Sequence, residues 1–508
     1  MRLIVDSRIR LVKSKLPKGS LTKIKAAFRY NNPDYFRKRN MGYYTGNIPR
    51  VIGTFRVEDD GRFLTVPRGG FQKLIEILGE FGADYQVVDR RLWDNPVDFN
   101  FDPGFPLREY QEEAVSRILE AETCLIEGAP ASGKTEILCA AIARAGGRAG
   151  VLVHDRNLFN QWVDRIQSSL HIPSKEIGRV GLGKFKLGPR ITVMMQQTAR
   201  NKVDQLKGYF DFLAADEVHH YAANTFLLTV DAIAARYRVG VSATVKRQDL
   251  KHFLTHDLFG DIVFSIDRQT LVDLGYTTEI ELHVVRTDFN YDYKNEAALR
   301  DYFETAFTDY DDLTAKEKRD AAEQLEMPPK DFPQYLDAIA GDSDRNNLIY
   351  QWVRREYDKG STCIIFAKRR EHCQLWAERL KKIGLECVVF WGTKGKAGEA
   401  KRIQKDLQRL KARKVRIAIG TVLDEGINMP AVDAGFITYR NAGNPGQLEQ
   451  QAGRLARLFT GKEVGRLYYF HDANIDAFER DERSLSKRFN RVVIHAKTRK
   501  RKKIRSKG

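Results

Sequence analysis

Residues 123–135, TCLIEGAPASGKT, decide the fold of this 508-residue chain. The first half is a short apolar run that predicts a buried strand, and the second half fits the pattern GxxxxGK[ST] and leads into a predicted helix. Backbone N–H groups in such a loop can hold phosphates, while its lysine reaches the β and γ oxygens and its last hydroxyl ligates Mg²⁺. An ordinary glycine-rich turn is the alternative, which the strand-loop-helix context disfavours. The predicted phosphate-binding residues are Gly128, Ala129, Pro130, Ala131, Ser132, Gly133, Lys134 and Thr135.

Short apolar runs alternate with amphipathic segments on both sides of this loop. The alternation begins after a Pro/Gly-rich break, NFDPGFP, stops near residue 266 and resumes before the strand TCIIFA. Such a pattern predicts parallel sheets covered by helices, so the expected fold class is α/β, with two tandem lobes and a small N-terminal α+β domain. The predicted domains are an N-terminal domain (1–100), a first lobe (101–266), a linker or insert (267–345), a second lobe (346–486) and a basic tail (487–508).

Composition excludes several classes of protein. Hydrophobic residues make up 42% of the chain and charged residues 30%, which fits neither global disorder nor a fibrous repeat. Five cysteines without CxxC spacing predict reduced core thiols instead of a disulfide framework or a zinc site. The charged N-terminal segment and the lack of a long uncharged run predict neither secretion nor a membrane span, so we expect a cytoplasmic protein, in the host cytoplasm if it is of phage origin.

The charge balance points to a polyanionic partner. Lys and Arg number 85 against 67 Asp and Glu, giving +18, and residues 487–508 hold eleven of these positive charges without an acid. A solvated, disordered tail is the alternative to nucleic-acid contact. Basic and aromatic residues also interleave near the N-terminus, where Arg37 and Tyr43 are candidate DNA contacts that could neutralise phosphates and stack on bases. An ordinary small β/α core with exposed charges would show the same mixture.

Two further groups of residues fit chemistry on a nucleotide. The apolar run FDFLAA ends at Asp216 and Glu217, where one carboxylate can hold Mg²⁺ and the next can orient the attacking water. Acid pairs at strand ends are common surface features, so the inference depends on the phosphate-binding loop. In the second lobe, Arg454 and Arg457 are three apart on a predicted helix and would share one face, from which both could reach a γ-phosphate as arginine fingers.

Together these stretches resemble a known family. GAPASGKT, DEVH, SAT and QQAGRLAR, in this order, look like motifs I, II, III and VI of superfamily 2 helicases, a resemblance that covers residues 107–475. It implies two RecA-like lobes that clamp ATP and step along a nucleic-acid strand. Asn428 stands where the family often has Asp. The resemblance further implies adenine recognition by Arg108 and Gln111; nucleotide binding by Gly426; DNA contacts by Arg156, Gln197, Thr198 and Thr421; and coupling by His219, Ser242, Thr244 and Gln450.

The branch of the superfamily follows from what surrounds the motifs. DEVH in place of DEAD and Gln450 in place of His favour DNA over RNA as the track. The N-terminal segment, with YNNP, GYYTG and VPRG before FQKLIEILGEFG, resembles the domain ahead of the motor in phage UvsW-type branch-migration helicases, although it lacks their Trp. We therefore expect an ATP- and Mg²⁺-dependent DNA helicase that unwinds and branch-migrates forked or four-way DNA in recombination, repair or replication restart.

Other functions remain open at this stage. A DEAH-type RNA helicase or a duplex translocase that does not unwind would carry the same ATP motifs. A nucleic-acid-binding module with an inactive motor is disfavoured because Lys134, Glu217 and Arg457 are all present. His219 could also simply cap a turn. The sequence leaves translocation polarity, oligomeric state and protein partners undetermined.

Overall fold

The computed structural model divides into two compact units, Met1–Thr270 and Leu271–Gly508, which are described separately. It describes residues 1–40, 44–94, 96–220, 228–243, 251–291, 332–391, 397–421, 423, 432–439, 445–459, 461–475, 481–486 and 488–495. No helix within these described ranges is long and apolar enough to cross a membrane. Of the five cysteines, four are buried and Cys387 is partly buried, and all five are free thiols.

A small α+β domain opens the first unit. Its five-stranded sheet has the order β5-β6-β2-β1-β7, and α1 and α3 supply the helical side of a core that contains Leu3, Ile9 and Leu74. A separate two-stranded ribbon pairs β3 with β4. The elements are β1 (Arg2–Val5), β2 (Arg8–Val12), α1 (Ser20–Ala27), β3 (Arg29–Asn31), α2 (Pro33–Asn40), β4 (Val51–Gly53), β5 (Arg56–Glu58), β6 (Phe63–Pro67), α3 (Phe71–Glu80) and β7 (Gln86–Asp89).

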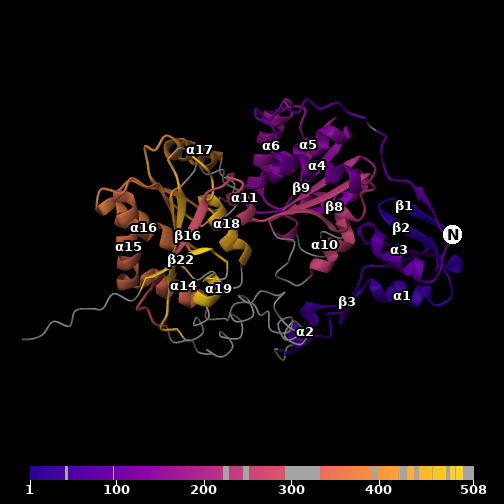
Figure 1. Cartoon of the computed structure of the whole chain (residues 1–508), viewed down its shortest axis with the longest axis horizontal. Coiled ribbons are helices and arrows are strands. Elements are labelled where there is room, and N and C mark those ends of the chain that lie inside the picture. Colours follow the sequence, from indigo (N-terminus) through magenta and orange to yellow (C-terminus); the bar gives the residue numbers. More distant parts are fainter. Residues whose placement is uncertain are drawn as a thin grey trace, which may run out of the picture. The chain divides into compact units, whose positions relative to one another are not determined.

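The rest of the first unit is an eight-stranded sheet of order β11-β10-β12-β9-β13-β14-β8-β15, parallel except for the β10–β11 pair. Its central strands are almost wholly apolar because helices cover both faces, with α4, α5 and α6 on one side and α10 on the other (Figure 1). The strands are β8 (Thr123–Gly128), β9 (Ala149–Val153), β10 (Gly178–Gly181), β11 (Lys184–Lys186), β12 (Ile191–Met195), β13 (Phe212–Asp216), β14 (Tyr237–Ser242) and β15 (Ile262–Ile266). The main helices are α4 (Glu109–Ala121), α5 (Lys134–Ala145), α6 (Arg156–Ser169), α7 (Gln196–Arg200), α8 (Val203–Leu206), α10 (His252–Phe259) and α11 (Arg268–Asp273).

The N-terminal domain is joined to the first lobe by buried polar contacts. Arg8 forms a buried ion pair with Asp231, and its Nη2 donates to the Thr54 carbonyl at 2.6 Å. From the lobe, Arg238 Nη2 donates to the Ser7 carbonyl at 2.9 Å. A Pro/Gly break such as the one near residue 103 is typical of a domain boundary, but removing residues 1–100 would leave Asp231 and Arg238 without these partners.

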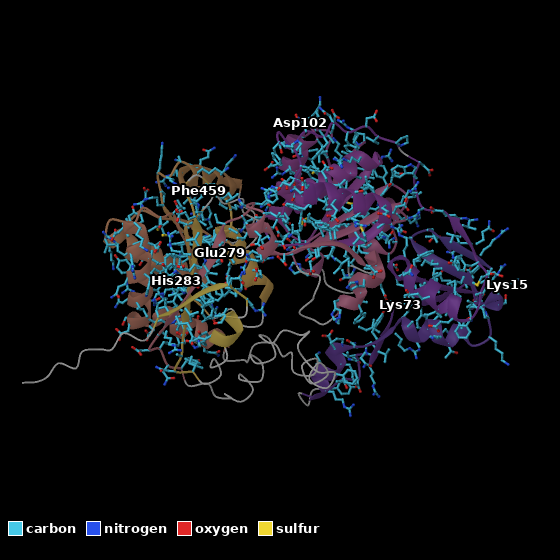
Figure 2. The ribbon with its side chains drawn as sticks, viewed as in Figure 1. Lys15, Lys73, Asp102, Glu279, His283 and Phe459 are labelled. Atoms are coloured by element: carbon cyan, nitrogen blue, oxygen red, sulfur yellow. The ribbon has the colours of Figure 1, made fainter. Side chains whose placement is uncertain are left out.

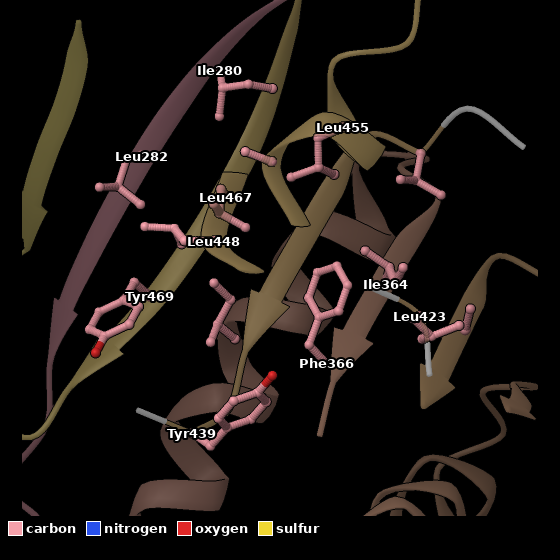
Figure 3. Close-up of a cluster of buried hydrophobic side chains, with 14 of the residues drawn as sticks. Ile280, Leu282, Ile364, Phe366, Leu423, Tyr439, Leu448, Leu455, Leu467 and Tyr469 are labelled. Carbon is pink, nitrogen blue, oxygen red and sulfur yellow. The ribbon is translucent and has the colours of Figure 1, made fainter. Parts of the chain in front are cut away.

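The second unit contains a seven-stranded parallel sheet of order β18-β19-β17-β20-β21-β16-β22. Its core is shown in Figure 3, where Ile280, Leu467 and Phe366 come from three different strands. The strands are β16 (Glu279–Arg286), β17 (Cys363–Phe366), β18 (Val388–Phe390), β19 (Ile417–Gly420), β20 (Ala434–Ile437), β21 (Val464–His471) and β22 (Arg491–His495). The helices are α14 (Phe332–Gly341), α15 (Ser343–Asp358), α16 (Arg370–Lys382), α17 (Ala397–Lys411), α18 (Pro445–Leu455) and α19 (Asp481–Ser486).

The predicted fold class is confirmed, since both parallel sheets and the small N-terminal α+β domain are present. Two of the predicted boundaries are wrong. Residues 279–286 were expected in a linker but form β16, which pairs with β21 along all eight of its residues. Residues 491–495 were expected in a basic tail but form β22, which pairs with β16. In both cases a short β-branched run lies among charged residues, and its pairing partner is distant in sequence. The remainder of the predicted tail, residues 496–508, lies outside the described residues.

Candidate functional site

The phosphate-binding motif forms a tight loop between β8 and α5. Ala131 and Gly133 both have left-handed backbones, with φ of 72° and 78°. A Cβ on Gly133 would lie 2.3 Å from Gln111 Nε2, so only glycine fits there. The Ser132 carbonyl accepts hydrogen bonds from Tyr110 Oη at 2.8 Å and Gln111 Nε2 at 3.2 Å. The loop is therefore fixed from the side of α4, and the expected strand-loop-helix geometry is present.

The predicted adenine-recognition residues lie at the start of α4. Gln111 is buried, and its Oε1 accepts from the Arg108 backbone N–H at 3.0 Å, which caps the start of this helix. Arg108 Nη1 donates to Tyr110 Oη at 3.2 Å. The structure thus connects this segment to the phosphate-binding loop, while base recognition by Gln111 stays a prediction. Tyr110, which lies between Arg108 and Gln111 in the sequence segment LREYQ, contacts the Ser132 carbonyl and so helps to fix the loop.

The acidic pair lies at the end of β13, where the parallel register brings it close to the loop after β8. Lys134 Nζ lies 3.5 Å from Glu217 Oε1 and donates to the Gly128 carbonyl at 2.9 Å. Glu217 has a left-handed φ of 50°, a conformation that costs a non-glycine residue energy and is common at functional sites. Lys134 and Glu217, 83 positions apart in sequence, are therefore adjacent.

Asp216 has a different environment from Glu217. It is 6% exposed, and its Oδ2 accepts a hydrogen bond from Trp162 Nε1 at 2.8 Å. Burial, together with the negative charge of Glu217, raises the pKa of Asp216 to about 6. A nearby cation would strongly stabilise the charged form of this carboxylate, which burial and the neighbouring negative charge disfavour. Sequence reasoning missed Trp162 as a partner, and the available signal was that a buried indole N–H requires an acceptor.

A chain of contacts links the acidic pair to the end of β14. His219 Nδ1 lies 2.6 Å from Ser242 Oγ and 3.4 Å from Glu217 Oε2. The Ala243 backbone N–H donates to Glu217 Oε2 at 3.4 Å. His219 and Ser242, predicted to couple the site to other parts of the motor, are thus in direct contact. Thr244 lies outside the described residues.

The predicted DNA contacts of the first lobe follow the ends of two neighbouring strands. Arg156 is the first residue of α6 and is exposed, and the Asp155 side chain caps this helix by accepting from Asn157 N and Leu158 N. Gln197 is exposed and Thr198 partly exposed on α7, which directly follows β12.

The other predicted contacts are described only in part. In the second unit, Thr421 is partly buried just after β19. Arg37 lies on α2, but its side chain is outside the described set, as are Tyr43 and Gly426 altogether. Their roles therefore stay predictions.

The arginine motif of the second unit differs from expectation in one respect. Gln450 is buried and Arg454 partly buried on α18, but this helix ends at Leu455, so Arg457 lies beyond it and the two arginines do not share a helix face. Lys462 anchors the segment that follows. Its Nζ donates to the carbonyls of Leu455, Arg457 (3.3 Å) and Val432 (2.7 Å).

Lys462 is held in place by its surroundings as well as by these carbonyls. Its Nζ lies 5.4 Å from the centre of the Phe459 ring, whose position Figure 2 marks. Burial lowers the pKa of Lys462 to about 8. Sequence reasoning missed Lys462, since a lone lysine in GKE carries no periodic signal.

Comparisons with known proteins match each of the two lobes to a family model. The family model described as type III restriction enzyme, res subunit, matches residues 104–247, and the helicase conserved C-terminal domain matches residues 344–459. Probable helicase D10 of Escherichia phage T5 is 26% identical over 76% of this chain and 76% of its own length. The protein named DNA 3'-5' translocase XPB2 of Sulfurisphaera tokodaii is 25% identical over 69% of this chain and 78% of that protein. Among solved structures, T4 UvsW aligns over 97% of this chain and all of that chain, at 16% identity and a TM-score of 0.40.

The fold and site define a P-loop ATPase with two RecA-like lobes. One family model matches each lobe, the model on the second lobe is a helicase domain, and the curated relatives named above are named as a probable helicase and a translocase. These matches confirm the resemblance to superfamily 2 helicases that the motifs indicate. Nucleotide use follows from these domains, so the expected enzyme class, an ATP-dependent helicase, is confirmed as well.

Proposed function

We propose that this protein is an ATP-driven DNA translocase that unwinds and branch-migrates forked or four-way DNA. The observation that carries the motor part of this proposal is that Lys134, Asp216 and Glu217 lie together at the carboxyl ends of the strands in the eight-stranded sheet. That arrangement supports separate roles for the three residues, with Lys134 as the cation that meets the phosphates, Asp216 as a metal ligand and Glu217 as the carboxylate that orients water.

The residues present fit Mg²⁺ together with ATP. Asp216 is buried, crowded by Glu217 and bonded to a single indole donor, so a divalent cation would relieve the repulsion between the two carboxylates. Thr135 at the start of α5 would supply a hydroxyl ligand. Within the described residues no group of three or more His, Cys, Asp and Glu could hold a metal alone, so phosphate oxygens would complete the site. Bound Mg²⁺ would neutralise charge that develops on the phosphates.

The chain's own residues then have separate tasks. Loop residues 128–135 hold the phosphates, and Lys134 moves from the Gly128 carbonyl to the β and γ oxygens. Glu217 orients the attacking water, and His219 with Ser242 fixes the position of Glu217. Arg454 and Arg457 stabilise the charge of the transition state. Each role follows from the family motif, supported by the contacts described above.

Three observations support DNA as the track and branched DNA as the substrate. A relative named as a DNA 3'-5' translocase favours DNA, and we infer movement in the 3′ to 5′ direction. The N-terminal domain is joined to the motor by buried contacts, so force from the first lobe would reach it. Its ribbon region also offers Tyr44, which is 82% exposed, and Arg50, which lies 5.7 Å from the ring of Phe36. Tyr30, part of the same basic-aromatic mix, instead stacks on Phe253 with ring centres 4.1 Å apart.

The test is the ATPase rate with single-stranded DNA, duplex, fork, four-way junction and RNA in parallel, together with unwinding and junction-migration assays. We expect DNA to stimulate hydrolysis more than RNA and the four-way junction to be migrated. The Tyr44→Ala variant should lose junction affinity and keep stimulation by single strands, while Tyr85→Ala, another exposed tyrosine of this domain, serves as the control. Stimulation by RNA alone would instead indicate an RNA helicase. ATPase activity on duplex without strand separation would indicate a translocase that does not unwind.

A further inference from the structure

The β10–β11 hairpin at the edge of the first-lobe sheet carries exposed apolar side chains. Gly181 pairs with Lys184, so its turn consists only of Leu182 and Gly183. Leu182 is 41% exposed and Phe185 is 40% exposed. Neither residue belongs to any of the helicase motifs, and the alternation of apolar runs did not predict these two short strands.

The sequence of this turn, Leu-Gly, is not the one that would make the hairpin most stable. Both Leu182 and Gly183 have left-handed backbones, with φ of 53° and 80°. Two-residue hairpin turns of this type favour Asn-Gly, because a bulky side chain at the first position is strained. A leucine that is both strained and exposed stabilises neither the turn nor the core, which points to a contact with another molecule.

The surroundings of the hairpin are strongly basic. Residues 175–207 contain eight Lys or Arg against two acidic residues, a net charge of +6 in 33 positions of a 508-residue chain whose total is +18. Lys202 Nζ lies 5.9 Å from the centre of the Phe185 ring. Among the described residues, no Asp or Glu forms an ion pair with Lys184 or Lys202. Positive charge around an exposed aromatic ring fits a single strand of nucleic acid, whose phosphates and bases need both.

The position of the hairpin agrees with this partner. β10 pairs with β12, and α7, which follows β12 and carries Gln197 and Thr198, packs against both strands. The hairpin therefore extends the surface on which the family motif already predicts a backbone contact.

We propose that the β10–β11 hairpin binds single-stranded DNA, with bases against Leu182 and Phe185 and phosphates on Lys184 and Lys202. The inference rests on the proposed function, since it assumes that the first lobe acts on DNA. In the chain, this DNA contact lies between the P-loop and the DEVH motif. It would not discriminate between base sequences, because stacking and phosphate neutralisation are both sequence-tolerant.

The test is equilibrium binding of the full-length protein to a fluorescent oligothymidine over a range of salt concentrations. Phe185→Ala should weaken binding about tenfold, the range found for loss of one stacked base. Leu182→Asn should weaken binding several-fold while the melting temperature stays equal or rises, because Asn-Gly suits the turn. The double variant Lys184→Gln/Lys202→Gln should flatten the slope of log affinity against log salt by about 1.4.

Two controls separate this contact from general effects. Phe105→Ala removes another exposed aromatic of the same unit, and Lys381→Gln/Lys382→Gln removes two exposed charges of the second unit, so both should bind as the wild type does. Wild-type affinity and salt slope in the hairpin variants, with wild-type hydrolysis still stimulated by DNA, would overturn the hairpin proposal alone. Failure of any DNA to bind or stimulate the wild-type protein would overturn the proposed function, and this inference with it.

Discussion

Asp216 and Asp472, one in each unit, both lie at the carboxyl end of a parallel strand, and their surroundings are opposite. In the second unit Asp472, directly after β21, accepts from Thr287 Oγ1 at 2.6 Å, Tyr335 Oη at 2.7 Å and Arg345 Nε at 2.8 Å. In the first unit Asp216 accepts from one donor among the described residues, the indole N–H of Trp162, and adjoins Glu217.

The contrast shows how one fold supports two uses of the same side chain. A carboxylate surrounded by donors and paired with a buried arginine stabilises the native state, whereas one crowded by a second carboxylate stores unfavourable charge that a metal can relieve. Position at the end of a strand therefore does not identify a catalytic acid, but its set of hydrogen-bond donors does. The predictions below test this difference, beginning with the largest effect.

Lys134→Ala should abolish ATP turnover, because the variant lacks the charge that meets the phosphates. Removal of this cation also leaves Glu217 without its ion pair at 3.5 Å. We expect nucleotide affinity to fall strongly while the melting temperature changes little. Calorimetric titration with ATP and a steady-state hydrolysis assay would check this, with Lys175→Ala as an exposed-lysine control. Substantial hydrolysis by the variant would contradict the assignment of the loop.

Arg345→Met should act on stability instead. Its side chain is fully buried beside Asp472, so the variant leaves that carboxylate without its cation, at a cost of about 3–5 kcal/mol. Denaturant unfolding followed by a probe in the second unit would measure the loss. Nucleotide affinity of the first unit should stay at the wild-type level. If Arg345→Met is as stable as the wild type, the ion pair between Arg345 and Asp472 does not stabilise the fold, and the contrast with Asp216 fails.

The sequence predicted where the phosphate-binding loop and the acidic pair lie, but not the side chains that hold Asp216 and Asp472 in place. The P-loop and the acidic pair could be found because each lies in one contiguous stretch whose flanking strand and helix have clear periodicity. Trp162, Tyr335 and Arg345 could not be found in this way, because each touches its partner only through the folded sheet. The ion pair of Arg8 with Asp231 had no local signal either, because its two residues lie more than 200 positions apart in the sequence.

Asp216→Asn should make the protein more stable at pH 8 although it removes a metal ligand. Burial and Glu217 raise the pKa of Asp216 to about 6, above its usual value of 3.8. The folded state therefore keeps this proton as the pH rises from about 4 to 6, and the stability that the bound proton provides is lost as the pH passes through 6. Asn resembles the protonated form, so the variant should gain roughly 3 kcal/mol at pH 8 and almost nothing near pH 4. Unfolding curves over this range test it, and a constant difference would contradict the charge argument.

Lys462→Met should have the smallest effect and act through Arg457. Because Lys462 Nζ donates to the carbonyls of Leu455 and Arg457, its loss should misplace the arginine and lower kcat about tenfold, with KM for ATP unchanged. On an Arg457→Ala background the same change should cost almost nothing further. Lys405→Met removes an exposed lysine of the same unit and serves as the control. If Lys462→Met lowers kcat equally in the wild-type protein and in Arg457→Ala, then Lys462 contributes to stability and does not act through Arg457.

The most direct measurement of the central claim is made on Glu217→Gln, with ATP affinity and DNA-stimulated turnover determined on the same preparation. The variant keeps Asp216 and Thr135 for the metal and Lys134 for the phosphates, and removes only the carboxylate that orients the attacking water. The account predicts ATP affinity within a few-fold of the wild type and turnover reduced by about 10³ or more. Turnover near the wild-type rate would contradict it, as would a loss of ATP binding as large as that of Lys134→Ala, because either result would mean that Glu217 is not the residue that activates water.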